Sequence, residues 1–144
     1  MRTGILRNDR GSVLLMVIFS ACLSLAVLLG AVAAASLYAA QKRLYMLTDA
    51  AALAASQSFD LGSVAVANGR LHQRLSSDNV AAASRLFLAQ IPDGAGVRLA
   101  SARAVSPTTA QVTLTTSWHP PVVSILFPRG VTISTTAQAE GVFF

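Results

Sequence analysis

The sequence predicts an α+β protein: a long N-terminal transmembrane and stalk helix, then a small domain of one helix packed on a roughly three-stranded antiparallel sheet. Two observations predict this class. No Asp, Glu, Lys or Arg occurs at positions 11–41, a run of 31 residues rich in Leu, Val and Ala. Two later stretches alternate side-chain type with a period of two, which is typical of half-buried strands. The expected segments are a cytoplasmic N-terminal segment (1–11), the transmembrane and stalk helix (12–58) and an extracytoplasmic domain (59–144).

The overall composition favours a membrane protein. Hydrophobic residues make up 53% of the 144 positions and charged residues only 12%, with a net charge of +5. Together with the charge-free run, this composition excludes an ordinary soluble enzyme and a disordered tail. The arginines are scattered singly and form no basic patch interleaved with aromatic residues, so we expect no nucleic-acid binding.

The first element is the membrane span. As a helix, residues 13–40 would be about 42 Å long, more than the roughly 30 Å hydrocarbon core requires. No polar face is present to suit a helix lying on the surface. Basic residues before the span outnumber those after it, so the positive-inside rule places the N-terminus in the cytoplasm. These residues are Arg2, Arg7 and Arg10 before it, and Lys42 and Arg43 after it. With this one predicted span, the chain is expected to be single-pass.

Two processing alternatives compete with a permanent span. The alanines at 33–35 resemble a signal-peptidase site, but the apolar core before them is long for a signal peptide. Residues 19–22, Phe-Ser-Ala-Cys, resemble a lipoprotein box, yet the residues after Cys22 remain apolar where a polar tether is usual. A buried membrane cysteine and an uncleaved span are the favoured interpretations.

Small side chains recur every fourth residue along the span and mark a candidate helix-packing face. Such a stripe lets a second helix approach closely, although an Ala-rich helix produces the same pattern without that role. The helix is expected to continue past the membrane as an amphipathic stalk that buries one face. The packing candidates are Cys22, Ala26, Gly30 and Ala34 in the span, and Leu44, Leu47 and Ala51 in the stalk.

The outer domain follows in order. Residues 59–69 are expected to form a connection and residues 71–75 a short strand. Residues 76–79, Ser-Ser-Asp-Asn, would cap a helix over 80–91 that ends at Pro92. The apolar face of that helix would contain Val80, Ala83, Phe87 and Ile91. Strands are predicted at 97–105, 110–118 and 131–139. A domain of this size has a small hydrophobic core, so we expect the stalk helix to pack against it and stabilise it.

No catalytic, metal-binding or cofactor-binding motif is recognisable. Cys22 is the single cysteine and lies in the span, and the six acidic residues form no acid–base pair. His119, beside two prolines, is more typical of a loop residue than of a ligand. We therefore expect no enzyme activity, no cofactor and no small-molecule substrate.

An apolar segment near the C-terminus is a candidate interface. It begins at Trp118 and contains Ile125, Leu126 and Phe127. These residues either close the core of the domain or form an exposed apolar edge that contacts another subunit or the bilayer surface. The first alternative is favoured.

An ordered set of motifs resembles the N-terminal region of TadE/TadG-like proteins of tight-adherence (Flp-type) pilus assembly systems. The set is D-R-G-S at 9–12, the uncharged span, Q-K-R-L at 41–44 and D-A-A-A-L-A-A at 49–55. The later W-H-P-P at 118–121 and F-P-R-G-V at 127–131 are similar to the outer domain of short actinobacterial-type members.

The resemblance implies a minor pilin-like or pseudopilin-like subunit in the cytoplasmic membrane, whose partners are the bilayer and other pilin-like or pilus-assembly subunits, including copies of itself. It also implies a processing site at Gly11 and Ser12. Related precursors often carry Glu five residues after the processed Gly, whereas Met16 stands at that position here. A permanently anchored assembly factor is therefore expected. The alternative is a secreted or membrane-tethered adhesin or ligand-binding protein unrelated to pili.

Overall fold

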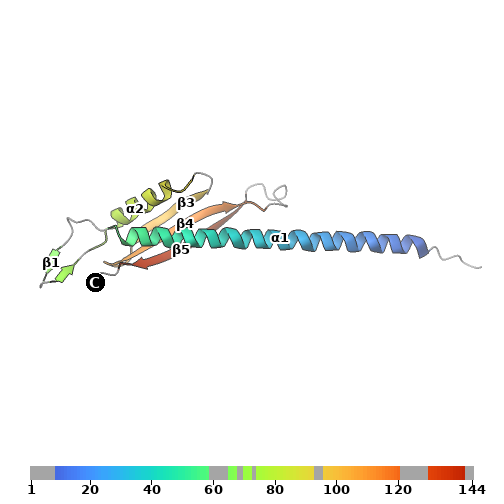
Figure 1. The fold of residues 1–144 in the computed structure, drawn as a ribbon, viewed down its shortest axis with the longest axis horizontal. Coiled ribbons are helices and arrows are strands. Elements are labelled where there is room, and N and C mark those ends of the chain that lie inside the picture. The colour runs from blue at the N-terminus through green and yellow to red at the C-terminus, as the bar shows by residue number, and fades with distance from the viewer. Residues whose placement is uncertain are drawn as a thin grey trace, which may run out of the picture.

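A helix of 48 residues runs along most of the length of the molecule, and a small α+β domain lies against its C-terminal half (Figure 1). The computed structural model describes residues 9–58, 65–67, 70–72, 74–92, 96–120 and 130–141. The elements are α1 (Asp9–Ser56), β1 (Ala65–Ala67), β2 (Arg70–His72), α2 (Ser77–Ala89), β3 (Val97–Ala104), β4 (Thr109–Trp118) and β5 (Val131–Glu140). The predicted class, α+β with a long apolar helix before a small domain, is confirmed.

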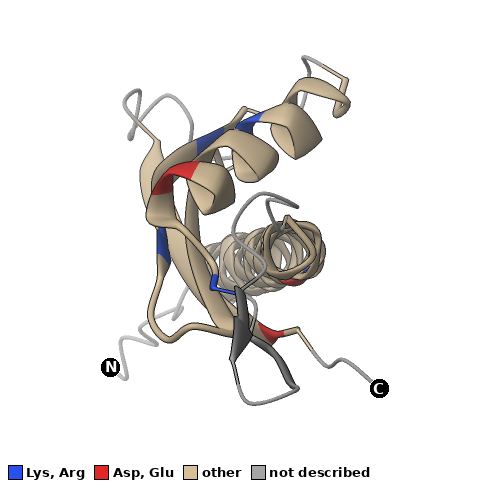
Figure 2. Cartoon of the chain, turned by 90° about the vertical axis from the view of Figure 1, so that its left-hand side faces the viewer, with Lys and Arg blue, Asp and Glu red and all other residues tan. Residues whose placement is uncertain are grey.

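The three long strands form one antiparallel sheet in the order β3–β4–β5. Both helices pack on the same face of this sheet, α1 across β4 and β5 and α2 across β3 (Figure 2). The predicted period of two is confirmed on β4, where Ala110, Val112 and Leu114 are fully buried beneath the helices. The opposite face is polar, and the hydroxyls of Thr113 and Thr136 hydrogen-bond across it at 2.9 Å.

Helix α2 is capped as predicted, and the predicted Val80 and Phe87 do pack in the core, but the buried face is shifted toward Ser84. The Ser76 side chain accepts a hydrogen bond from the backbone N–H of Asp78 at 3.3 Å. The helix ends at Ala89, so Ile91 lies beyond it. Ser84, and not Ala83, is fully buried, because its hydroxyl donates to the carbonyl of Val80 at 2.7 Å and so needs no partner elsewhere.

The prediction for residues 59–75 was wrong in detail. Strand β1 lies inside the expected connection and pairs with β2 in a two-stranded antiparallel sheet. The short strand expected at 71–75 ends at His72. Leu75 is buried and its N–H donates to the carbonyl of Pro107 at 2.9 Å, which ties the start of α2 to the turn between β3 and β4. Leu75 therefore helps to hold α2 against the domain and is not part of a strand. Its apolar side chain alone does not distinguish these two roles.

Candidate functional site

The N-terminal half of α1 is exposed over its entire circumference. Every side chain from 11 to 32 is exposed, and the large apolar ones present 37% to 75% of their surface. Helix α1 is long and apolar enough to cross a membrane by length and composition. Ser20 and Ser24 donate their hydroxyls to the carbonyls of Val17 and Ser20, at 3.0 and 2.8 Å. Their polar groups are therefore satisfied within the helix, as an apolar environment requires.

The small-residue stripe lies within this exposed half. Cys22, Ala26, Gly30 and Ala34 are all exposed, so the domain of the same chain does not cover them. A Cβ added at Gly30 meets nothing within 4 Å. The stripe is thus free of intramolecular contacts among the described residues, and its role in packing against a second helix stays a prediction.

The C-terminal half of α1 is the part that packs on the sheet. Leu44 and Ala51 are buried and Leu47 is half-buried, in agreement with the predicted face. Four further positions outside the predicted set are fully buried, namely Thr48, Ala52, Ala55 and Ser56. From Leu44 through Thr48 and Ala52 to Ala55 and Ser56, the buried positions follow one another at steps of three or four residues, which is a usable signal, but the polar residues among them argue against burial.

The buried polar side chains of this half are satisfied locally. The Thr48 hydroxyl donates to the carbonyl of Leu44 at 2.7 Å, and that of Ser56 donates to the carbonyl of Leu53 at 2.8 Å. These bonds offset the cost of burying the two hydroxyls away from water. The side chains are also small, so the helix backbone can approach the sheet closely.

Trp118 connects the domain to the helix at the point where the two halves of α1 meet. Its indole N–H donates to the hydroxyl of Ser36 at 3.2 Å, across 82 positions of sequence, and the side chain is half-buried. This candidate interface residue therefore has an intramolecular partner. The other candidates of that segment, Ile125, Leu126 and Phe127, lie outside the described residues.

Gly130 holds the start of β5 close to the end of β4. Its φ of +65° is a left-handed conformation that favours glycine. A Cβ at this position would lie 2.9 Å from both His119 Nε2 and the Trp118 carbonyl oxygen. Only glycine fits here without displacing the segment that carries Trp118.

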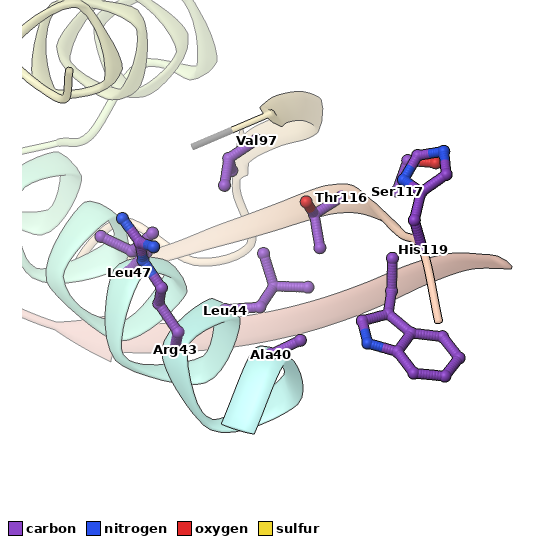
Figure 3. Close-up of a pocket in the computed structure, with 9 residues that line it drawn as sticks. Ala40, Arg43, Leu44, Leu47, Val97, Thr116, Ser117 and His119 are labelled. Atoms are coloured by element: carbon purple, nitrogen blue, oxygen red, sulfur yellow. The ribbon is translucent and has the colours of Figure 1, made fainter. Parts of the chain in front are cut away.

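A cavity of about 200 Å³ opens beside this junction, between α1 and the adjacent ends of β3 and β4 (Figure 3). Apolar side chains line part of it, and Arg43 and His119 contribute charged and polar atoms from opposite sides. The complete lining is Ala40, Arg43, Leu44, Leu47, Val97, Thr116, Ser117, Trp118 and His119.

The remaining candidate residues lie in the N-terminal half of α1 and do not line this cavity. In the part of the chain that the structure describes, no three His, Cys, Asp or Glu side chains gather as metal ligands would. Gly11 and Ser12, the residues of the implied processing site, are exposed in the first turn of α1. Cys22 is a free thiol at the exposed stripe.

Comparison of the chain with protein-family models, with curated proteins and with solved structures finds no match. The geometry described above is therefore the ground on which a function is proposed.

Proposed function

We propose that this protein is a membrane-anchored, minor pilin-like subunit of a tight-adherence type IV pilus or secretion system, acting through helix packing and subunit contacts. In this proposal the N-terminus is cytoplasmic and the domain extracytoplasmic. The observation that carries it is the division of one continuous helix into an exposed apolar half and a half packed on the sheet.

A free apolar half supports an assembly role because it suits two environments. Burying it in a bilayer removes large apolar side chains from water. The same surface, with its small-residue stripe, is able to pack against the span of another subunit once inside the membrane. The packed half meanwhile keeps the domain at a fixed position on the helix, so that subunits with associated helices would present their domains in a regular way.

The resemblance of the ordered motifs to those of TadE/TadG-like proteins supports the choice of a pilus or secretion system among membrane assemblies. Met16 supports the anchored form of the proposal, since the acidic residue typical of processed precursors is replaced by an apolar one. The N-terminal sequence of the membrane-extracted protein tests this point. An intact N-terminus supports a permanent anchor, whereas a mature chain that begins at Ser12 would refute it.

Disruption of the stripe tests the role in assembly. In the native host, deletion of the gene should abolish surface pili or secretion, and the wild-type gene should restore them. A variant with Ala26→Leu and Gly30→Leu enlarges two stripe residues and should fail to restore them. The matched control, Ser24→Leu with Ala31→Leu, enlarges two residues on the opposite side of the helix and should restore them. Equal complementation by both variants would contradict helix packing through the stripe.

The single cysteine allows a direct test of proximity between copies. Oxidation of membranes that contain the wild-type chain should give a disulfide-linked dimer through Cys22, if copies pack through the stripe. A variant with Cys22→Ala and Ser24→Cys moves the thiol to the opposite side of α1 and should give markedly less. A dimer yield that does not depend on the position of the thiol would indicate random collision.

A further inference from the structure

The position of the domain along α1 corresponds to a definite depth in a bilayer. The charge-free residues 11–41 span about 45 Å as a helix, close to the 40–45 Å of a bilayer that includes both headgroup layers. With Arg10 and Lys42 at the two surfaces, Ser36 lies about 9 Å inside the surface on the side of the domain. That depth belongs to the headgroup layer and its border with the acyl chains.

The hydrogen bond to Ser36 brings Trp118 to this same depth. The ends of β4 and β5 that carry Trp118 and Gly130 face the exposed half of α1, so this end of the domain faces the membrane (Figure 1). Tyr38, two residues beyond Ser36, is 66% exposed. Trp and Tyr are enriched where a membrane meets water, because their rings combine an apolar body with a polar group.

Basic side chains stand immediately beyond the aromatic ones. Lys42 and Arg43 are exposed, and Arg43 reaches the cavity that His119 and Ser117 also line (Figure 3). From the helix, these long side chains are able to extend toward the phosphates of a nearby leaflet. The order along α1 is thus apolar, aromatic and then basic, which matches the order of layers that a bilayer presents from its core outward.

From these placements we propose that the membrane-facing end of the domain docks on phospholipid headgroups. Trp118 and Tyr38 lie in the interfacial layer, and Lys42 and Arg43 bind headgroup phosphates. This docking sets the height and tilt of the domain over the leaflet, in addition to the anchoring by α1. The proposal rests on the membrane anchoring in the proposed function and is independent of any role in pili.

The chain contains one Trp and one Cys, which provide two depth markers in the full-length protein. Cys22 lies about 21 Å from Ser36 along the helix, inside the expected hydrocarbon region. The full chain, labelled at Cys22 with a bimane dye, is reconstituted in phosphatidylcholine–phosphatidylglycerol vesicles. The phosphatidylcholine is brominated either near the headgroup or near the chain end.

We expect shallow bromines to quench Trp118 at least about twofold more than deep ones, and deep bromines to quench the Cys22 label more than shallow ones. Quenching of the Cys22 label without quenching of Trp118 would overturn headgroup docking and leave the anchor intact. Failure to quench either marker would refute the anchor itself. Protection of Trp118 from aqueous acrylamide that rises with protein density, without bromine quenching, would show that a second copy covers the surface instead.

The phosphate contacts have their own matched test. A variant with Lys42→Gln and Arg43→Gln should lose the greater part of the increase in Trp118 quenching that phosphatidylglycerol causes over phosphatidylcholine alone. The control, Arg74→Gln with Arg103→Gln, removes two exposed basic residues at the far end of the domain and should respond as the wild type does. An equal response of both variants would refute binding of phosphate by Lys42 and Arg43.

Discussion

The two halves of α1 have similar small and aliphatic side chains but opposite surroundings. Between residues 11 and 32 no side chain is buried, whereas six side chains between 44 and 56 expose 1% or less. This difference in burial arises from the side of α1 that carries charged residues. In the second half, Lys42, Arg43 and Asp49 are exposed on one side of the helix while the other side packs on the sheet. The first half has no such polar side, so its favourable surroundings are apolar on all sides.

This comparison teaches that an Ala- and Leu-rich helix segment does not by its composition specify what it packs on. Where charged residues occupy one face, the opposite face packs on the domain of the same chain. Where they are missing, the segment is apolar on all sides and is suited to contact with lipid or with another helix. Substitutions of the same type in the two halves should therefore have unequal effects on the domain.

Truncation of a leucine should give the largest contrast. Leu44→Ala removes a side chain that is 1% exposed and should lower the free energy of unfolding of the domain by about 2–5 kcal/mol. Leu25→Ala, in the exposed half, should change it by less than about 0.5 kcal/mol. Urea unfolding of the full chain in detergent micelles, followed by Trp118 fluorescence, measures both. Equal losses would mean that the two halves are buried alike.

Much of this fold could be predicted from the sequence because two simple periodicities are strong. The charge-free run located the exposed half of α1, and alternation on β4 identified Ala110, Val112 and Leu114 as core residues. The packed face of α1 was predicted less well. Thr48 and Ser56 look polar, but their hydroxyls bond to the preceding helix turn and so can be buried.

Contacts between segments that are distant in the chain could not be predicted from the sequence. Nothing local to Ser36 or Trp118 indicates that they meet, because the pairing depends on how far along α1 the sheet is placed. The positive φ of Gly130 could not be predicted either, since a glycine after Pro and Arg is compatible with several types of turn. The small-residue stripe could be identified from the spacing of its residues alone. The contacts among Ser36, Trp118 and Gly130 could be found only in the three-dimensional structure.

Enlargement of an alanine should give the next largest contrast. Ala51 is fully buried against the sheet, and Ala51→Leu should destabilise the domain by about 1–3 kcal/mol through overpacking. Ala26→Leu should leave the unfolding midpoint unchanged, because Ala26 is exposed. The same urea titration compares them. A stability loss caused by Ala26→Leu would reveal an intramolecular partner for the stripe.

Substitution of Gly130 should loosen the junction without altering α1. Gly130→Ala forces an L-residue into a left-handed conformation and places a methyl group 2.9 Å from the Trp118 carbonyl oxygen, which should cost about 1–2 kcal/mol. A red shift of Trp118 emission together with a lower urea midpoint would confirm this. The control Gly30→Ala, in the exposed half and with nothing within 4 Å, should change neither quantity.

The smallest effect is expected at the boundary between the halves. Ser36→Ala removes the hydroxyl that accepts from the Trp118 indole and should cost about 0.5–1.5 kcal/mol in micelles. Ser36→Thr keeps a hydroxyl and should recover most of that loss. A double-mutant cycle with Trp118→Phe, followed by circular dichroism, isolates the pair, and a coupling energy near zero would show that the hydrogen bond does not stabilise the domain.

In vesicles the cost of Ser36→Ala should be smaller, because interfacial water and lipid carbonyl groups can accept from an indole that docks there. The difference between micelles and vesicles thus measures how far the membrane replaces a contact that the chain makes with itself.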